Sequence, residues 1–179
     1  DIFGYHVISD EEAKKGADKL NRNYHYLVVD IKHSTLHLNS NGKTLRNSDS
    51  IPAYKGQIYI YNTALGEIQG YQSSKGFILG KKWHFTRNGI TCSGDNFMQK
   101  LGEIDFNGFD YCYIEQTQNA IKWIRDVRYN GHEWSLLPYP SRKELLPNMK
   151  NERDNGWRVI KKKLNEKIND ITSIWMCGV

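Results

Sequence analysis

The sequence is poor in the residues that cross-link or interrupt a chain, with 3 cysteines and 4 prolines among 179 residues. Cys92, Cys112 and Cys177 cannot form a disulfide framework, because at most one bridge can join them and three free thiols are equally compatible. No Cys and His spacing typical of a zinc site occurs, so we expect no metal and no other cofactor. No apolar run approaches the roughly 18 residues that span a membrane.

The first residues, Asp1 to Gly4, include neither an initiator methionine nor a signal-peptide pattern. This start is typical of a cleaved or trimmed chain, whose targeting segment we expect to be missing from view. We therefore expect a soluble chain and leave its localisation open. Secretion, or transfer between cells as a processed domain, is among the alternatives.

Folded structure is indicated by the abundant aromatic residues, which make up 12% of the chain and include 11 Tyr and 5 Trp. Disordered chains lack such residues. The length suits one domain at about 100–200 residues per domain. We therefore expect residues 1–179 to form a single domain with one hydrophobic core.

Five Asn-Gly dipeptides punctuate the chain, and Asn-Gly suits both central positions of the type I′ turn that joins antiparallel strands. Four of them are expected to form hairpins, at 41–42, 88–89, 107–108 and 130–131. A fifth hairpin is predicted to join 57–61 to 67–71, and another strand to cover 26–29. A helix is the alternative for residues 118–129.

Helix signals lie near both ends of the chain. Ser9 and Glu12 have the spacing of a capping box, which predicts a helix from there to about Leu20. Near the other end, apolar residues recur every three or four positions, at Trp157, Ile160, Leu164, Ile168, Ile171 and Trp175. The predicted fold is α+β: an antiparallel β meander, as a curved sheet or open barrel, with an N-terminal helix and a C-terminal amphipathic helix packed on it.

The formal net charge of +5 is distributed unevenly. Residues 31–100 hold nine Lys and Arg against three Asp and Glu, together with aromatic residues such as Tyr59 and Trp83. Cations for phosphates and flat rings for stacking suit a nucleic acid, with RNA favoured, or another polyanion. An ordinary solvated basic face is the alternative.

Two His-x-Thr units follow one another along the chain, His33-Ser34-Thr35 and His84-Phe85-Thr86. On a strand, residues two apart face the same side, so each His would lie beside a Thr hydroxyl. This pairing resembles the motif of the two-histidine phosphoesterases. The resemblance implies hydroxyls that hold a phosphate between two histidines, on RNA ends or cyclic phosphates. Isolated strand histidines are the alternative.

A broader expectation is a metal-independent ribonuclease or phosphodiesterase of toxin or effector type. Such an enzyme needs a base, an acid and a cation for the phosphorane. We expect His84 and His132 to be the acid and base, with Arg87 stabilising charge. Further candidates bind substrate: Lys82 on phosphate, Tyr59 or Trp83 by stacking, and His33, Thr35 and Thr86 as above.

Two other function classes stay open. At Cys92 a strand is expected to pass into a short helix, whose N-terminus would favour a thiolate, and His132, forty residues later, is a candidate base for a thiol hydrolase of peptide or amide bonds. The Cys92-Ser93-Gly94 segment is similar to the nucleophile region of some cysteine peptidases and amidases. Alternatively, Cys92 is a small buried residue. The third class is a non-catalytic β-rich binding module with a protein partner on its sheet face.

Overall fold

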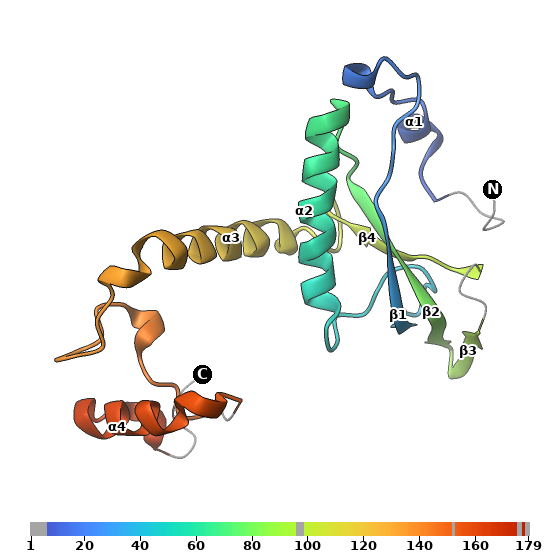
Figure 1. Ribbon diagram of the computed structural model, residues 1–179. Coiled ribbons are helices and arrows are strands. Elements are labelled where there is room, and N and C mark those ends of the chain that lie inside the picture. The colour runs from blue at the N-terminus through green and yellow to red at the C-terminus, as the bar shows by residue number, and fades with distance from the viewer. Residues whose placement is uncertain (1–6, 96–98, 152, 175–176, 178–179) are drawn as a thin grey trace. The chain divides into compact units, whose positions relative to one another are not determined.

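The computed structural model, which describes residues 7–95, 99–151, 153–174 and 177, has an α+β fold with one open mixed sheet (Figure 1). Its α-helices are α1 (Asp10–Ala13), α2 (Ile51–Gln69), α3 (Cys112–Asn130) and α4 (Arg158–Ile168). Its strands are β1 (Val29–His37), β2 (Lys75–Arg87), β3 (Ile90–Gly94) and β4 (Gly102–Asp105). Short 3-10 turns lie at Asp18–Leu20, Gly131–Glu133, Lys143–Leu145, Asn155–Trp157 and Ile171–Ser173.

The chain forms two compact units, residues 1–121 and 122–179, and α3 begins in the first and ends in the second. The first unit contains the sheet and α2, and the second contains α4. In the sequence, residues 1–121 hold 13 Lys and Arg against 13 Asp and Glu, and residues 122–179 hold 12 against 7. The formal net charge of the chain therefore comes from the second unit.

One side of the sheet is parallel, so the prediction of an antiparallel meander was wrong there. β1 pairs with β2 in parallel, and α2 makes the connection between them. On its other edge, β2 pairs antiparallel with β3 near its end and with β4 near its start. The sheet thus has β2 as its central strand, with a parallel β-α-β unit on one side and two short antiparallel partners on the other.

Helix α2 occupies the segment predicted as the hairpin 57–71, and that prediction was wrong. Its buried positions recur at helical spacing, but half of them are polar, which hides the stripe from a search for apolar residues. They are Ile51, Lys55, Ile58, Asn62, Gly66 and Gln69. The polar members are paired: Asn62 Nδ2 donates to Ser73 O at 2.5 Å, and Gln69 Nε2 donates to Tyr71 O at 2.8 Å.

The Asn-Gly turns divide into two kinds. At Asn88-Gly89, which joins β2 to β3, φ is 50° and 77°, as a type I′ turn requires, so this hairpin is confirmed. The loop around Gly42 (φ 65°) closes on one bridge between Leu38 and Leu45. The hairpins at 107–108 and 130–131 were wrong, since α3 covers 112–130 and the helical alternative holds.

Both terminal helix signals mark real helices, although the helices are shorter than expected. The Ser9 side chain accepts a hydrogen bond from Glu12 N, as the capping box predicts, and α1 ends at Ala13. Helix α4 ends at Asn169, whose φ is 51°. Leu164 is buried, whereas Trp157 is 70% exposed. The packing of this helix on the sheet stays a prediction.

A fully buried ion pair fixes the segment after β4 to α2. Lys55 Nζ lies 2.5 Å from Asp110 Oδ1, and both side chains have no exposed surface. The ammonium also donates to Asn47 Oδ1 at 2.6 Å and to Leu45 O at 3.2 Å. Asp105 N donates to the other carboxylate oxygen of Asp110 at 3.1 Å. This pairing turns residues 105–110 inward, which explains why no hairpin forms there.

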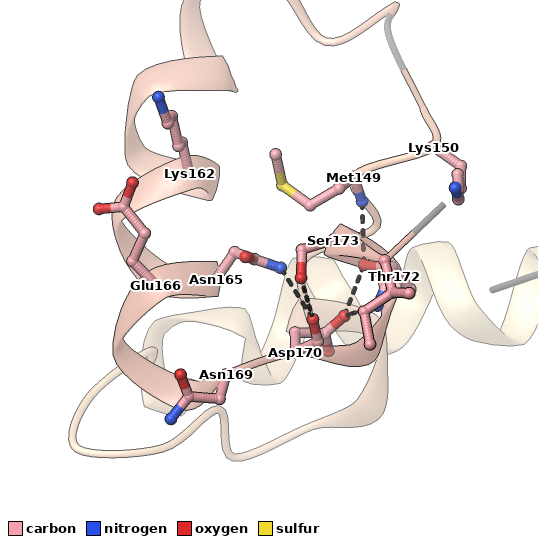
Figure 2. A pocket seen from close by; sticks show the side chains of 10 residues that line it. Met149, Lys150, Lys162, Asn165, Glu166, Asn169, Asp170, Thr172 and Ser173 are labelled. Atoms are coloured by element: carbon pink, nitrogen blue, oxygen red, sulfur yellow. Dashed lines mark hydrogen bonds between the residues drawn. The ribbon is translucent and has the colours of Figure 1, made fainter. Parts of the chain in front are cut away.

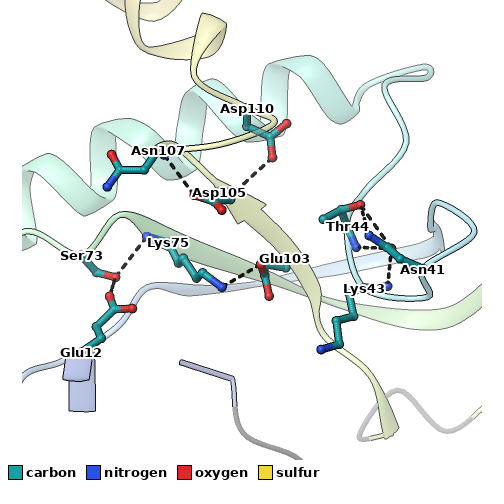
Figure 3. A network of polar contacts seen from close by, with 10 residues as sticks. All are labelled: Glu12, Asn41, Lys43, Thr44, Ser73, Lys75, Glu103, Asp105, Asn107 and Asp110. Atoms are coloured by element: carbon teal, nitrogen blue, oxygen red, sulfur yellow. Dashed lines mark hydrogen bonds and ion pairs between the residues drawn. The ribbon is translucent and has the colours of Figure 1, made fainter. Parts of the chain in front are cut away.

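A chain of polar contacts links α1, β2 and β4 in the first unit (Figure 3). Ser73 Oγ donates to Glu12 Oε1 and accepts from Lys75 N. Lys75 Nζ in turn lies 2.8 Å from Glu103 Oε1. The carboxylates of Glu12 and Glu103 therefore lie beside Ser73 and Lys75, which belong to the basic segment 31–100.

Gly76 of β2 lies against α2 so closely that no side chain fits. An ideal Cβ there would lie 2.3 Å from Ile58 Cγ2, and Ile58 has no exposed surface. We expect Gly76→Ala to destabilise the first unit by about 1–3 kcal/mol, measured by urea unfolding. Gly131→Ala is the control, because its Cβ would approach nothing nearer than 3.8 Å. Equal stability of the two variants would contradict this packing.

Candidate functional site

Two histidines meet on the sheet, one from each of the parallel strands. His37 of β1 and His84 of β2 are register partners. Their rings share a hydrogen bond of 3.1 Å between His37 Nδ1 and His84 Nε2. Both side chains are partly buried. The sequence pointed to His84 but not to His37, because only the parallel register brings the two together.

The two His-x-Thr units are not brought together as equivalent halves. His33 is exposed, and a register shift separates Lys32 from Thr35, which lies opposite Lys82. An acid and a base on the two apical oxygens of a phosphorane must flank the phosphorus. The two rings that meet, His37 and His84, are in direct contact, so they can act only from one side of a ligand.

The predicted acid–base pair lies in two different units. His84 belongs to the first, whereas His132 lies in the turn Gly131–Glu133 of the second. The His132 side chain is 74% exposed, and its Nε2 lies 3.7 Å from Glu133 Oε1. Arg87 ends β2 beside the Asn88-Gly89 turn and is exposed. Catalysis by these residues stays a prediction.

The predicted substrate-binding residues have partners within the protein. Lys82 Nζ lies 3.1 Å from Asp95 Oδ1 on the surface. Trp83 stacks on Phe85 with ring centroids 5.9 Å apart. Thr86 Oγ1 shares a hydrogen bond of 3.2 Å with Thr91 Oγ1 across the hairpin.

Tyr59, the other predicted stacking residue, lies on α2 and not on a strand. Its hydroxyl accepts from Gln118 Nε2 at 3.0 Å, and its ring packs edge-on against Phe106 with centroids 5.5 Å apart. The side chain is partly buried. It therefore lies at the contact between α2 and the start of α3.

Cys92, the predicted nucleophile of the thiol alternative, is a strand residue of β3 opposite Phe85 and is partly buried. The helix expected after it would fall on residues 96–98, which lie outside the described residues. All three cysteines are free thiols. The thiol hydrolase stays a prediction with its base in the other unit.

A polar cluster that the sequence analysis missed lies between β1 and α2. Lys32 Nζ donates to Gln57 Oε1 at 2.7 Å and forms an ion pair with Asp30 Oδ2 at 2.8 Å. The side chains of Lys32 and Asp30 are 19% and 20% exposed. Asp30 Oδ2 is itself buried, and the Lys32 ammonium is its ion-pair partner.

Two tyrosines of α2 hold this cluster in place. Lys32 Nζ lies 4.4 Å from the ring centroid of Tyr54, a cation–π contact. Gln57 Nε2 donates to Tyr61 OH at 2.6 Å, which fixes the amide that accepts from Lys32. The ammonium is therefore positioned by a carboxylate, an amide and a ring, while the cluster stays open to solvent.

The sequence contained a usable signal for this cluster. Asp30 and Lys32 are two apart and so face one side of a strand, and Gln57 and Tyr61 are four apart and so share one face of a helix. The predicted strand at 57–61 hides this signal. A strand would also bring Gln57 and Tyr61 to one face, but it gives no reason to place that face against Asp30 and Lys32.

Several lysines of the basic segment 31–100 are paired with carboxylates of the protein and so present less free positive charge to a ligand. Of the nine Lys and Arg between residues 31 and 100, four form ion pairs with carboxylates: Lys32, Lys55, Lys75 and Lys82.

Lys55 also lies 5.3 Å from the ring centroid of Tyr113. Burial, with smaller effects from Cys112 and Asp110, raises the pKa of the Tyr113 hydroxyl above its ordinary value.

The second unit has a groove of about 870 Å³ beside α4 (Figure 2). Lys150 and Lys162 line it together with Glu166 and Asp170, so its charges balance. Asp170 Oδ1 accepts from Thr172 N at 2.9 Å. Asp170 is thus held within the protein by the turn that follows α4.

Comparison with protein-family models, curated proteins and solved structures finds no match to this chain. In the part of the chain that the structure describes, no three His, Cys, Asp or Glu side chains lie close enough to hold a metal ion. No described helix has the length and hydrophobicity of a membrane span.

Proposed function

We propose that the first unit binds a nucleic acid and hydrolyses its phosphodiester bonds at the Asp30–Lys32–Gln57 cluster. The observation that carries this proposal is the ammonium of Lys32, which lies within 2.8 Å of both Gln57 Oε1 and Asp30 Oδ2 in a partly buried site. A fixed cation beside a carboxylate can stabilise negative charge and leaves a group that accepts a proton.

Lys32 and Asp30 have chemical roles in hydrolysis, and Gln57 holds the Lys32 ammonium in position. Water attacks phosphorus, the bond to the leaving oxygen breaks, and negative charge grows on the phosphoryl oxygens. A fixed ammonium such as Lys32 stabilises that charge without reorganising during the reaction. Asp30 takes the proton of the attacking water, and the leaving oxygen takes a proton from solvent. If a divalent cation binds with the substrate, Asp30 would be its protein ligand and the cation would supply further positive charge.

A groove beside the cluster supports a substrate larger than phosphate. It has a volume of about 600 Å³ between α2 and the start of α3, and Gln57 and Tyr61 form part of its wall. This volume lies within the range of about 300–1,000 Å³ that is usual for small-molecule sites. Ile60 and Tyr61, both about half exposed, give it an apolar surface suited to a sugar and base.

The proposal is tested by incubating the full chain with end-labelled single- and double-stranded RNA and DNA, with Mg²⁺ and with EDTA. We expect cleavage by the unmodified protein and a loss of at least a hundredfold in Asp30→Asn, because the amide neither accepts the proton nor holds a cation. Asp18→Asn is the matched control, since Asp18 is exposed and lies outside the cluster.

The outcomes separate the mechanisms. Activity lost in EDTA assigns Asp30 to a cation, and activity kept in EDTA assigns it to the proton. The histidine mechanism predicts instead that His84→Ala and His132→Ala abolish cleavage while Asp30→Asn does not. No cleavage of any substrate by the unmodified protein would contradict the proposed function.

A further inference from the structure

A small pocket lies where β1 and β2 end together. Its volume is about 200 Å³, below the roughly 300–1,000 Å³ of most small-molecule sites. Its polar lining residues are Asn39, Ser40, Arg46, His84 and Thr86. We call it the Arg46 pocket.

The chain after β1 folds back to build this pocket and is tied to the sheet at both ends. Leu38 N donates to His84 O at 3.0 Å, and Arg46 N donates to His37 O at 2.8 Å. Between them the loop turns at Gly42, where a Cβ would lie 3.0 Å from the ring of Phe85. The pocket is therefore pre-organised by backbone contacts.

The charged side chain that lines the pocket is positive, and no negative side chain lines it. Arg46 lines it, and none of its lining residues is acidic. The structure gives Arg46 no ion pair with any described residue, whereas Lys75 and Lys82 on the same sheet are paired with Glu103 and Asp95. A guanidinium with nearby hydroxyls and an imidazole is the donor set that binds phosphate oxygens well.

The contact between His37 and His84 determines which ring nitrogen of His84 can donate a hydrogen bond in the pocket, beside the Arg46 guanidinium. His84 Nε2 is engaged with His37 Nδ1. Nδ1 is therefore the ring nitrogen of His84 left to donate to a ligand when Nε2 accepts from His37. This gives the histidine pair a role in orienting a donor.

We propose that the Arg46 pocket binds one phosphate group of the nucleic acid, away from the bond that is cleaved. The identity of the ligand as a nucleic acid rests on the proposed function, whereas phosphate binding itself does not. Lys32 and His37 are five residues apart on β1, at most roughly 17 Å at about 3.3 Å per residue, and the register shift between Lys32 and Thr35 shortens this span. The pocket therefore holds a phosphate at a distance from the Asp30–Lys32–Gln57 cluster.

The test compares Arg46→Gln with Lys81→Gln, each of which removes one positive charge from the first unit; Lys81 is exposed on β2 and does not line the pocket. Binding of a fluorescent single-stranded oligonucleotide is measured by anisotropy over a range of NaCl concentrations, in the Asp30→Asn background. We expect Arg46→Gln to weaken binding about tenfold and to reduce the slope of log K against log salt by about 0.7. Lys81→Gln should change binding less than twofold.

Inorganic phosphate provides a second, independent readout. Its addition should shift the imidazole NMR signals of His84 and His37, but not those of exposed His33 and His132, and the shifts should disappear in Arg46→Gln. Equal effects of Arg46→Gln and Lys81→Gln, or no shift with phosphate, would overturn the pocket. Phosphate binding without cleavage would contradict the proposed function alone, and cleavage with unchanged Arg46→Gln binding would contradict the pocket alone.

Discussion

Replacing Lys32 with methionine is expected to lower the rate of phosphodiester cleavage by about 100- to 1,000-fold. The ammonium is fixed by Gln57 Oε1 at 2.7 Å and Asp30 Oδ2 at 2.8 Å, so it meets the developing charge without rearrangement. Methionine keeps an unbranched apolar side chain that is one atom shorter, and it removes the charge, the donors and the cation–π contact with Tyr54. Initial rates at saturating substrate measure the effect.

Lys81→Met is the matched control for this prediction. Lys81 lies on β2 and is exposed, and the structure gives it no ion pair with a described residue. It should change kcat less than threefold, although it removes the same charge. Thermal unfolding should show that both variants are folded. A Lys32→Met protein with full activity would place the chemistry elsewhere, and equal losses in both variants would indicate a general effect of charge.

Local turn chemistry predicted one hairpin of this fold correctly and failed at others of the same composition. Asn88-Gly89 forms its hairpin because both residues adopt positive φ and the flanking strands pair directly. Asn107-Gly108 has the same composition, but Asp110 is drawn to Lys55, which is 55 residues away in the chain. Such a contact has no local signature, so a strong turn signal there gives the wrong structure.

Helix α2 shows why periodicity misled the prediction. Its buried stripe includes Lys55, Asn62 and Gln69, which become core residues only because distant groups hydrogen-bond to them. Alternation of Ile and Tyr between 57 and 61 then dominates the pattern and favours a strand. A helix whose core face is half polar is recognised only when the partners of those polar groups are known.

The candidate sites were open to prediction to different degrees. Asp30 and Lys32 share a face by strand geometry alone, so this pair could be identified from the sequence. His84 was identified by residue type, but its partner His37 depends on the parallel register of β1 and β2. Register between strands that a helix connects is set by tertiary packing, and no turn residue encodes it.

The largest effect on stability is expected at the buried Lys55–Asp110 pair. Asp110→Asn leaves the Lys55 ammonium without its carboxylate in a site with no exposed surface. Removal of one partner from a buried ion pair costs about 3–5 kcal/mol, because the remaining charge is uncompensated. Asparagine keeps an acceptor for Asp105 N, so the loss reports on the charge. Urea unfolding measures the free energy of unfolding.

The double variant Lys55→Met/Asp110→Asn separates the cost of an unpaired charge from the value of the pair. With both charges removed, we expect it to be more stable than either single variant, since replacing a buried ion pair with neutral groups is often close to neutral. The coupling energy from the double-mutant cycle should therefore be at least about 2 kcal/mol. Additive losses would show that the two side chains act independently, and that residues 105–110 are fixed to α2 by other contacts.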